Sequence, residues 1–169
     1  TVITQNVDDL HTQAGNTRVI EVHGNLFRFR CLSCYTRRKL MKEEVLTLGR
    51  RVVDALGRSG FQEIIELLPQ CTSCGSPMRP DVVMFGEAVH DLHRAFEEAE
   101  TCDVLLIMGT SGTVYPAASV PAIARHARAK IIDINPRESA FSSLLDVHIR
   151  EKSAKGIPLV MDMMKRMFL

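Results

Sequence analysis

Aromatic residues are scarce in this 169-residue sequence: they make up 5% of it, and Trp is absent. Platforms on which nucleic-acid bases could stack are therefore not expected. Neither sign of charge is in excess, since the formal net charge is +1, so nothing favours a nucleic-acid partner or an anionic membrane. The longest apolar runs, such as Val104–Met108 and Ile157–Met161, are too short to span a bilayer.

The sequence also lacks a charged and apolar leader segment, so secretion is not indicated. Hydrophobic residues make up 46% and charged residues 24% of the chain, a balance able to bury a core. The length fits one domain, or one domain with a small additional module. No Met precedes Thr1, and Val2–Thr4 is expected to be a strand, which favours a fragment of a longer protein.

Cysteine gives the first positive signal. Two CxxC pairs, Cys31 with Cys34 and Cys71 with Cys74, accompany a single Cys102, which is expected to be a buried small hydrophobe. Two such pairs supply the four thiolates of a tetrahedral zinc site, and a site closed by four Cys is structural. Redox dithiols or buried thiols are the alternatives. Without an export signal, metal binding is favoured over disulfides, and the expected compartment is the reducing cytoplasm.

Apolar strands and amphipathic helices alternate after Cys74. Strands are predicted at 82–85, 104–108, 130–134 and 146–149, and helices at 91–101, 117–127 and 157–168. This alternation predicts an α/β fold with a parallel sheet and ligand sites at the carboxyl ends of its strands. The fully apolar segment Val104–Met108 is typical of a sheet buried on both faces.

Shorter elements are predicted before Cys74. Strands are expected at 2–4 and 18–23, a short helix at 9–14, and two helices at 43–56 and 61–68. The two longer helices lie between the CxxC pairs, so this insertion is expected outside the metal core.

Polar loops follow three of the strands, at 4–8, 109–113 and 135–137. Small residues at a strand end let backbone N–H groups approach a phosphate, and Asn or Asp can bond sugar hydroxyls. Ordinary turns use the same residues, but three such loops at one end of a sheet favour a nucleotide, although the GxGxxG fingerprint is absent. His23, before Gly24, is the best candidate for a general base because His titrates near neutrality; a structural His is the alternative.

At these residues the sequence resembles the sirtuin family. The matching segments follow the family's order over essentially the whole chain, least clearly in the insertion and the final helix. They are Thr4-Gln5-Asn6-Val7-Asp8-Asp9-Leu10-His11, Glu21-Val22-His23-Gly24, the paired CxxC, Arg79–Glu87, Gly109-Thr110-Ser111, Val114–Ala118 and Ile134-Asn135.

The resemblance implies an NAD-dependent protein-lysine deacylase with two domains. A Rossmann-like parallel sheet, incomplete at its N-terminal side, would comprise residues 1–26 and 81–169. A small zinc-ribbon domain would comprise residues 27–80, with a helical insertion at about 42–68. NAD and an acylated lysine of a protein would meet between the domains, where the acyl oxygen would attack the ribose carbon as nicotinamide leaves. The resulting imidate would lead to free lysine and O-acyl-ADP-ribose.

The resemblance also implies roles for individual residues. His23 would act as general base on a ribose hydroxyl. The cofactor-binding residues would be Gln5, Asn6, Asp8, Gly109, Thr110, Ser111, Asn135 and Ser153. The substrate would bind as an added strand against Met84, Phe85, Gly86, Glu87, Val114 and Tyr115. The zinc ligands would be Cys31, Cys34, Cys71 and Cys74.

The sequence departs from the family pattern at three places. The glycine-rich GAGxS opening would precede Thr1 and is not in the sequence. Arg137 stands where the family commonly has Glu, and Arg150-Glu151-Lys152 replaces the usual glycine-flanked segment before Ser153. Two other functions are open: mono-ADP-ribosyl transfer on the same scaffold, and a non-catalytic zinc-ribbon module that binds partners through residues 42–68.

Overall fold

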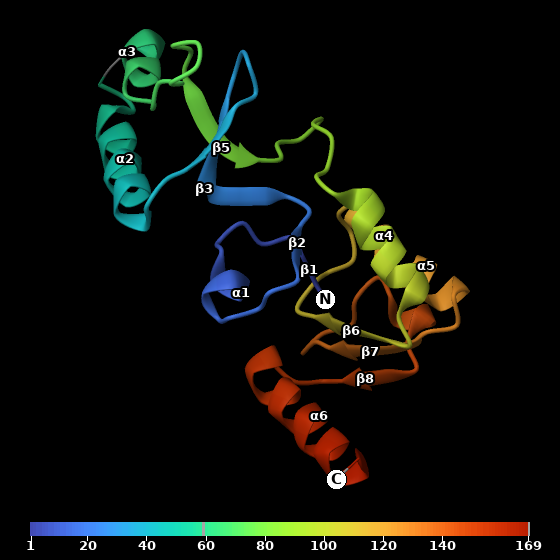
Figure 1. The fold of residues 1–169 in the computed structure, drawn as a ribbon. Coiled ribbons are helices and arrows are strands. Elements are labelled where there is room, and N and C mark those ends of the chain that lie inside the picture. The colour runs from blue at the N-terminus through green and yellow to red at the C-terminus, as the bar shows by residue number, and fades with distance from the viewer. Residues whose placement is uncertain (59, 169) are drawn as a thin grey trace. The chain divides into compact units, whose positions relative to one another are not determined.

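The computed structural model describes residues 1–58 and 60–168 (Figure 1). The chain divides into two compact units, Thr1–His90 and Asp91–Leu169. None of the helices in the described part of the chain has the length and apolar character that a membrane span requires.

The first unit begins with a small parallel sheet. Strand β1 (Val2–Thr4) pairs with β2 (Val19–Glu21), and the short helix α1 (Leu10–Gln13) lies in the connection between them. All three elements were predicted, but the strand expected over 18–23 ends at Glu21. It ends there because the chain turns at Val22 and His23, and Gly24 already opens the next strand.

A three-stranded antiparallel sheet follows, here called the zinc sheet. Strand β3 (Gly24–Cys31) lies between β4 (Arg37–Lys39) and β5 (Met78–Val82). The strand predicted at 82–85 is therefore wrong in its bounds. Pro80 falls inside the real strand, which is possible because β5 is an edge strand and an edge position tolerates a residue without an N–H.

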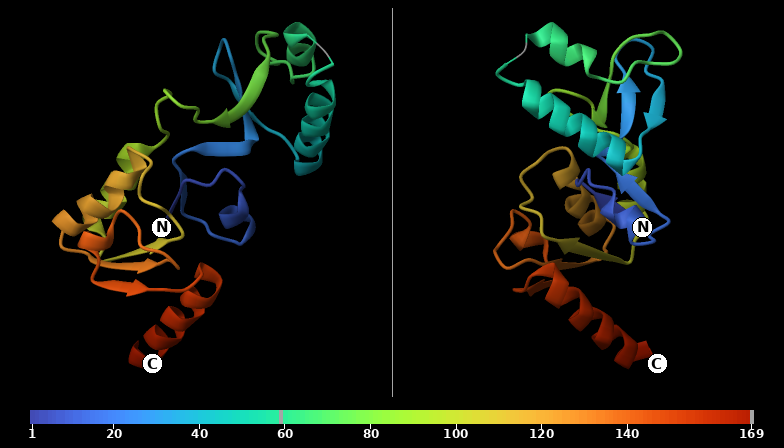
Figure 2. Two further views of the ribbon diagram at one scale, coloured as in Figure 1. Left: turned by 180° about the vertical axis from the view of Figure 1, so that it is seen from behind. Right: turned by 90° about the vertical axis from the view of Figure 1, so that its left-hand side faces the viewer.

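One face of the zinc sheet packs against the helical insertion. Phe29, Cys31 and Met78 are buried there, and Val45 and Leu48 of helix α2 pack against them. Helix α2 (Lys42–Ala55) is followed by helix α3 (Phe61–Glu66) at one end of this unit (Figure 2). Both helices were predicted to within two residues.

The second unit contains a parallel sheet with the strand order β6-β7-β8. Its strands are β6 (Val104–Met108), β7 (Lys130–Ile134) and β8 (Val147–Ile149). Its helices are α4 (Leu92–Thr101), α5 (Val120–His126) and α6 (Ser153–Phe168), with 3₁₀ turns η1 (Ala117–Ser119) and η2 (Ser142–Leu144). The predicted alternation of strand and helix is confirmed.

The side chains of β7 alternate between the two faces of this sheet, as the pleat requires. Ile131 packs with Ala118 and Phe141 on one face, whereas Ile134 lies under Gly156 in the first turn of α6 on the other. Burial of β6 on both faces was expected but is incomplete. Its two terminal residues are exposed, because β6 is an outer strand of the three.

Candidate functional site

The four paired cysteines converge at one end of the zinc sheet. Cys31 ends β3, Cys34 lies in the turn that follows it, and Cys71 and Cys74 precede β5. Their sulfur atoms all lie within 4.8 Å of one another. The Sγ–Sγ distances are 3.5 Å for Cys31–Cys74 and 3.5 Å for Cys34–Cys71.

This arrangement fits a zinc ion. Four sulfurs around Zn²⁺ at bonds of about 2.3 Å would lie about 3.8 Å apart, close to the separation seen. Hydrogen bonding with Thr36 lowers the pKa of Cys34 to about 6, and hydrogen bonding with Ser76 lowers the pKa of Cys74. Thiolates are the form that binds metal. The four residues would therefore hold zinc as a closed, structural cross-link between β3 and β5.

His23 lies in the turn between β2 and β3, half-buried. Its carbonyl oxygen accepts the N–H of Val83 at 3.0 Å, so its backbone is tied to the segment that follows β5. Gly24 is next, with a φ of +82°, and a Cβ there would lie 1.9 Å from the carbonyl oxygen of Asp81. Only glycine allows β3 to approach β5 this closely beside His23.

The loop after β1 carries the first group of predicted cofactor residues. Asp8 accepts the N–H of Leu10 at 3.1 Å and so helps to start α1. The N–H of Asn6, a residue exposed to solvent, donates to Thr4 Oγ1 at 3.1 Å. Gln5 is half-buried. Side-chain oxygens of Thr4 and Asp8 thus hold the backbone of the loop, and Asn6 is exposed to solvent.

The second group of predicted cofactor residues gathers in the second unit. Asn135 follows β7 and donates its side-chain amide to the carbonyl of Thr110 at 3.0 Å. The N–H of Gly109 donates to Ile134 at 3.3 Å, and a Cβ on Gly109, whose φ is +62°, would lie 3.7 Å from Ser153 Oγ. The structure therefore brings Gly109, Thr110, Asn135 and Ser153 together at the carboxyl ends of β6 and β7.

Ser111 completes this loop. Its hydroxyl bonds the hydroxyl of Thr113 at 2.8 Å, and its carbonyl accepts the N–H of Ala140 at 3.0 Å. Gly112 lies against the ring of Phe141, where a Cβ would come within 2.7 Å of the ring. The loop after β6 is thus fixed on the segment that follows β7.

The predicted substrate residues lie on two exposed segments. Met84 and Phe85 follow β5 in the first unit, and Val114 and Tyr115 follow β6 in the second; all four are exposed apolar side chains. Gly86 turns the first segment with a φ of +87°. Exposed apolar side chains of this kind can contact a bound peptide.

Glu87 holds the first of these segments in place. Its carboxylate accepts the N–H of Met84 at 3.0 Å, contacts the guanidinium of Arg79 and lies 3.5 Å from Arg30. The hydrogen bond from Arg79, followed by that from Met84, lowers the pKa of Glu87 to about 2. This carboxylate is therefore ionised at any pH at which the protein would work.

A buried ion cluster in the first unit was not predicted. Asp81 is fully buried and faces Arg28 at 2.9 Å, Arg37 at 2.8 Å, Arg30 at 3.4 Å and His90 at 3.4 Å. Burial alone would raise the pKa of Asp81, but the hydrogen bond from Arg28 and the surrounding positive charges outweigh it and lower the pKa. No local sequence pattern signals this cluster, because its members come from β3, β4, β5 and the segment that follows β5.

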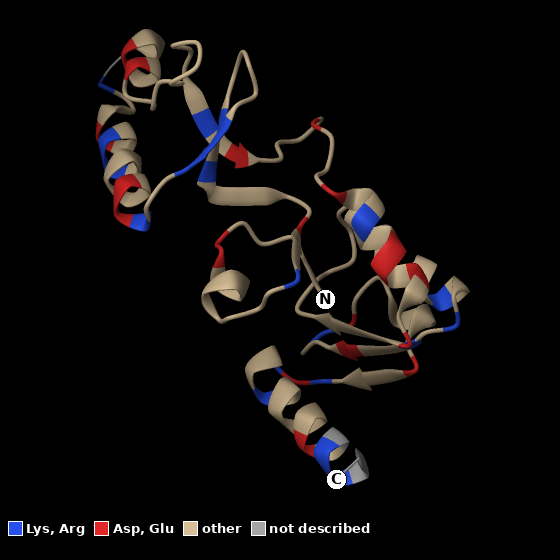
Figure 3. Cartoon of the chain, in the orientation of Figure 1, with Lys and Arg blue, Asp and Glu red and all other residues tan. Residues whose placement is uncertain are grey.

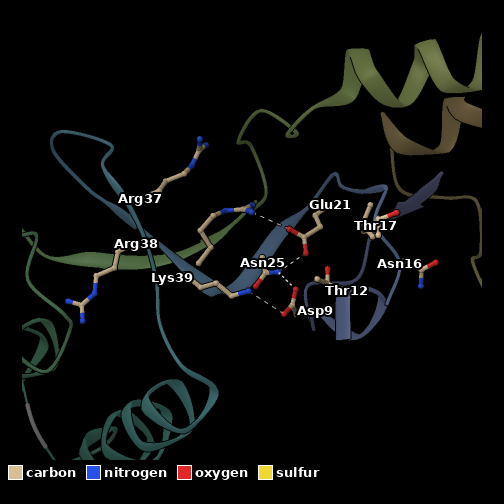
Figure 4. Close-up of a pocket in the computed structure, with 11 residues that line it drawn as sticks. Asp9, Thr12, Asn16, Thr17, Glu21, Asn25, Arg37, Arg38 and Lys39 are labelled. Atoms are coloured by element: carbon tan, nitrogen blue, oxygen red, sulfur yellow. Dashed lines mark hydrogen bonds and ion pairs between the residues drawn. The ribbon is translucent and has the colours of Figure 1, made fainter. Parts of the chain in front are cut away.

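A pocket of about 350 Å³ opens beside this cluster (Figure 4). Its lining combines hydroxyl and amide groups with charges of both signs: Asp9, Thr12, Asn16, Thr17, Val19, Glu21, Asn25, Arg28, Arg37, Arg38 and Lys39. Asn25 donates to Asp9 at 3.1 Å and to Glu21 at 2.5 Å, so the two carboxylates of the pocket share one buried amide.

The sequence of this chain is similar to a known protein family and to several of its members. The sequence model described as "Sir2 family" matches residues 1–116. An NAD-dependent protein deacylase of Desulfosudis oleivorans is 46% identical over 165 residues, which cover 98% of this chain and 60% of that protein. One of Thermococcus kodakarensis is 46% identical over 160 residues, which cover 93% of this chain and 57% of that protein.

Solved structures of Sir2 proteins are also similar to this chain. A Sir2 homologue bound to ADP-ribose aligns with a TM-score of 0.79 at 38% identity, covering 99% of this chain and 61% of that one. A Sir2 protein bound to a propionylated peptide aligns with a TM-score of 0.74 at 29% identity, covering 96% and 62%. The chain thus spans about 60% of the length of the relatives that it matches.

Proposed function

The chain belongs to the Sir2 family, and on that premise we propose that the protein is an NAD-dependent protein-lysine deacylase. One observation carries this proposal within the first unit. The backbone of His23, the candidate base, is hydrogen-bonded to Val83, at the start of the segment that would hold the substrate. A base and a substrate segment joined in this way keep a fixed distance from each other, as general base catalysis requires.

NAD would supply an electrophilic ribose carbon and nicotinamide as the leaving group. His23 would take a proton from a ribose hydroxyl. Gln5, Asn6 and Asp8 would line the pocket for the nicotinamide and its ribose. Backbone N–H groups of the Gly109–Ser111 loop would hold phosphate oxygens, and Asn135 and Ser153 would hold that loop and the adenosine end.

The acyl-lysine peptide would add as a strand to the exposed segments. Met84, Phe85 and Gly86 of the first unit would bind it through main-chain hydrogen bonds that accept many sequences, and Val114 and Tyr115 are the proposed substrate residues of the second unit. Glu87 would keep the first segment in its binding conformation through Met84 and Arg79. The zinc ion held by the four cysteines would take no part in the chemistry.

We also propose that residues 1–26 and 81–169 form the nucleotide domain and residues 27–80 the small zinc domain. The cytoplasm is the proposed compartment, since four clustered thiols that bind zinc require reducing conditions.

The test is turnover by the intact gene product. Incubation with NAD and an acetyl-lysine peptide should release nicotinamide and convert the peptide to its deacetylated form, both measured by mass spectrometry. The change His23→Ala should lower the rate at least about 100-fold, whereas His93→Ala, on the exposed surface of α4, should not change it.

Three outcomes would contradict the proposal. Labelled ADP-ribose could pass to protein without loss of acyl groups, which would indicate a transferase. If no acyl peptide yields nicotinamide, a non-catalytic zinc-ribbon module is favoured. If turnover survives His23→Ala, His23 is not the general base.

A further inference from the structure

The two faces of the zinc sheet differ sharply in charge. One face packs its apolar side chains against α2. On the other face, residues paired across the strands are cations: Arg28 opposite Lys39, Arg30 opposite Arg37, and Arg30 opposite Arg79. We call these five residues the cationic face; Figure 3 shows Lys and Arg concentrated on these strands.

Four carboxylates accompany the cationic face, but three of them are withdrawn from solvent. The side chains of Asp81, Glu21 and Asp9 are 0%, 16% and 12% exposed. Arg37 and Lys39 are 54% and 71% exposed. A ligand that approaches this face therefore meets positive charge first, although the number of charges is nearly balanced.

The fourth carboxylate, Glu87, connects the cationic face to the proposed substrate segment. Arg79 and Arg30 hold one of its oxygens, and the other accepts the N–H of Met84. The cationic face thus begins where the Met84–Glu87 segment ends.

The pocket beside the cationic face has room for a side chain. Lys39 reaches across it toward Asp9, whereas Thr12 and Thr17 lie on the opposite wall (Figure 4). Arg37 uses its Nε to bond Asp81, so its terminal NH₂ groups can serve a second carboxylate in the bidentate manner typical of Arg.

We propose that the cationic face binds acidic residues that flank the acyl-lysine in the substrate protein, with Arg37 and Lys39 as the contacting groups. This inference rests on the proposed deacylase function and narrows its substrates to acyl-lysines in an acidic sequence context. Main-chain pairing along Met84–Glu87 would accept any sequence, so the cationic face would supply the selectivity. Exposed charge pairs contribute modestly to the free energy of binding. The expected preference for an acidic over a neutral peptide is therefore about threefold to tenfold.

The experiment compares one acetyl-lysine peptide in three versions, with Glu, Gln or Lys at the flanking positions. For the intact gene product, KM should be about threefold to tenfold lower for the Glu version than for the Gln version, and highest for the Lys version. Binding of the fluorescein-labelled peptides, followed by anisotropy, should give the same order. The preference should shrink as salt rises from about 0.05 M to 0.5 M, because exposed charges are screened.

A pair of double variants locates the effect. Arg37→Gln with Lys39→Gln should abolish the difference between the Glu and Gln peptides. Arg50→Gln with Arg51→Gln removes the same charge but should keep the difference, because both residues are exposed on α2 and neither of them lines the pocket beside the cationic face.

The outcomes separate this inference from the function on which it rests. Turnover of all peptides with equal KM would overturn the acidic preference and leave the deacylase in place. Loss of the preference in both double variants would show that net charge, and not the cationic face, is responsible. If Arg37→Gln with Lys39→Gln fails to fold, a preference of the unchanged protein that does not respond to salt is the contradicting result.

Discussion

Gly24 lies directly against Asp81: a Cβ at position 24 would lie 1.9 Å from the Asp81 carbonyl oxygen. This contact joins the turn that contains His23 to the strand that leads to Met84. It lies in the first unit and holds β3 and β5 together at the end opposite the cysteines. The close approach explains why a side chain cannot be accommodated after His23.

Replacing Gly24 by Ala should therefore lower the free energy of unfolding by much more than the strain of a positive φ alone would. Gly57 provides a matched control, since it has the same φ of +82° but nothing within 4 Å of its Cβ position. Gly57→Ala should lower the free energy of unfolding by about 1 kcal/mol, and Gly24→Ala by about 3 kcal/mol or more. Urea unfolding followed by circular dichroism would measure both; equal losses would contradict the close contact.

Zinc should be bound at one ion per chain and should stabilise the first unit. Metal analysis of the purified protein should give that ratio, and Cys74→Ser should reduce it strongly while Cys102→Ser leaves it unchanged. A chelator should lower the melting temperature, because metal binding is coupled to folding. A protein that retains its melting temperature after complete removal of zinc would not need the ion for stability.

Glu87 should stabilise the fold in a pH-dependent way. Its pKa in the folded state, about 2, lies below the ordinary value of 4.5. A group with a lowered pKa contributes stability that is fully present above its unfolded pKa and is lost as pH falls through the folded value. The difference in melting temperature between the unchanged protein and Glu87→Gln should therefore shrink between about pH 4.5 and pH 2. A constant difference over that range would show that the ionised carboxylate is not responsible.

Asp81 should be among the least replaceable acidic residues. Asp81→Asn would leave Arg28, Arg30 and Arg37 without the carboxylate that they share, and the loss of one partner from a buried ion pair costs about 3 kcal/mol. The control, Asp54→Asn, alters an exposed residue of α2 and should change stability by less than about 0.5 kcal/mol. Both values can be taken from chemical denaturation, and a neutral effect of Asp81→Asn would mean that the cluster is strained.

Several elements could be predicted because their sequence pattern is local. Val104–Met108 is a continuous apolar segment and Lys130–Ile134 carries three Ile residues, each between polar loops, and both were predicted with the bounds that the structure shows. The cysteine cluster follows from the spacing within each CxxC pair, because a short turn places two sulfurs side by side.

Other elements depend on pairing between distant segments. Strand β4 consists of Arg37, Arg38 and Lys39, a basic run without any apolar residue, and it is a strand because β3 offers it an edge. The Asp81 cluster requires β3, β4 and β5 to align across the helical insertion, which no local pattern reveals. The roles of the predicted cofactor and substrate residues stay predictions, since they concern bound molecules.

Cys31 and Arg30 are neighbours on β3, yet one faces the metal site and the other the ion cluster. A slip of one residue in the pairing of β3 would exchange the two sides, placing a guanidinium among the thiolates and a thiol among the guanidinium groups. Binding of zinc by Cys31 would thus also fix which side chains form the cationic face. A bound zinc ion would select the register of β3 without contacting that face.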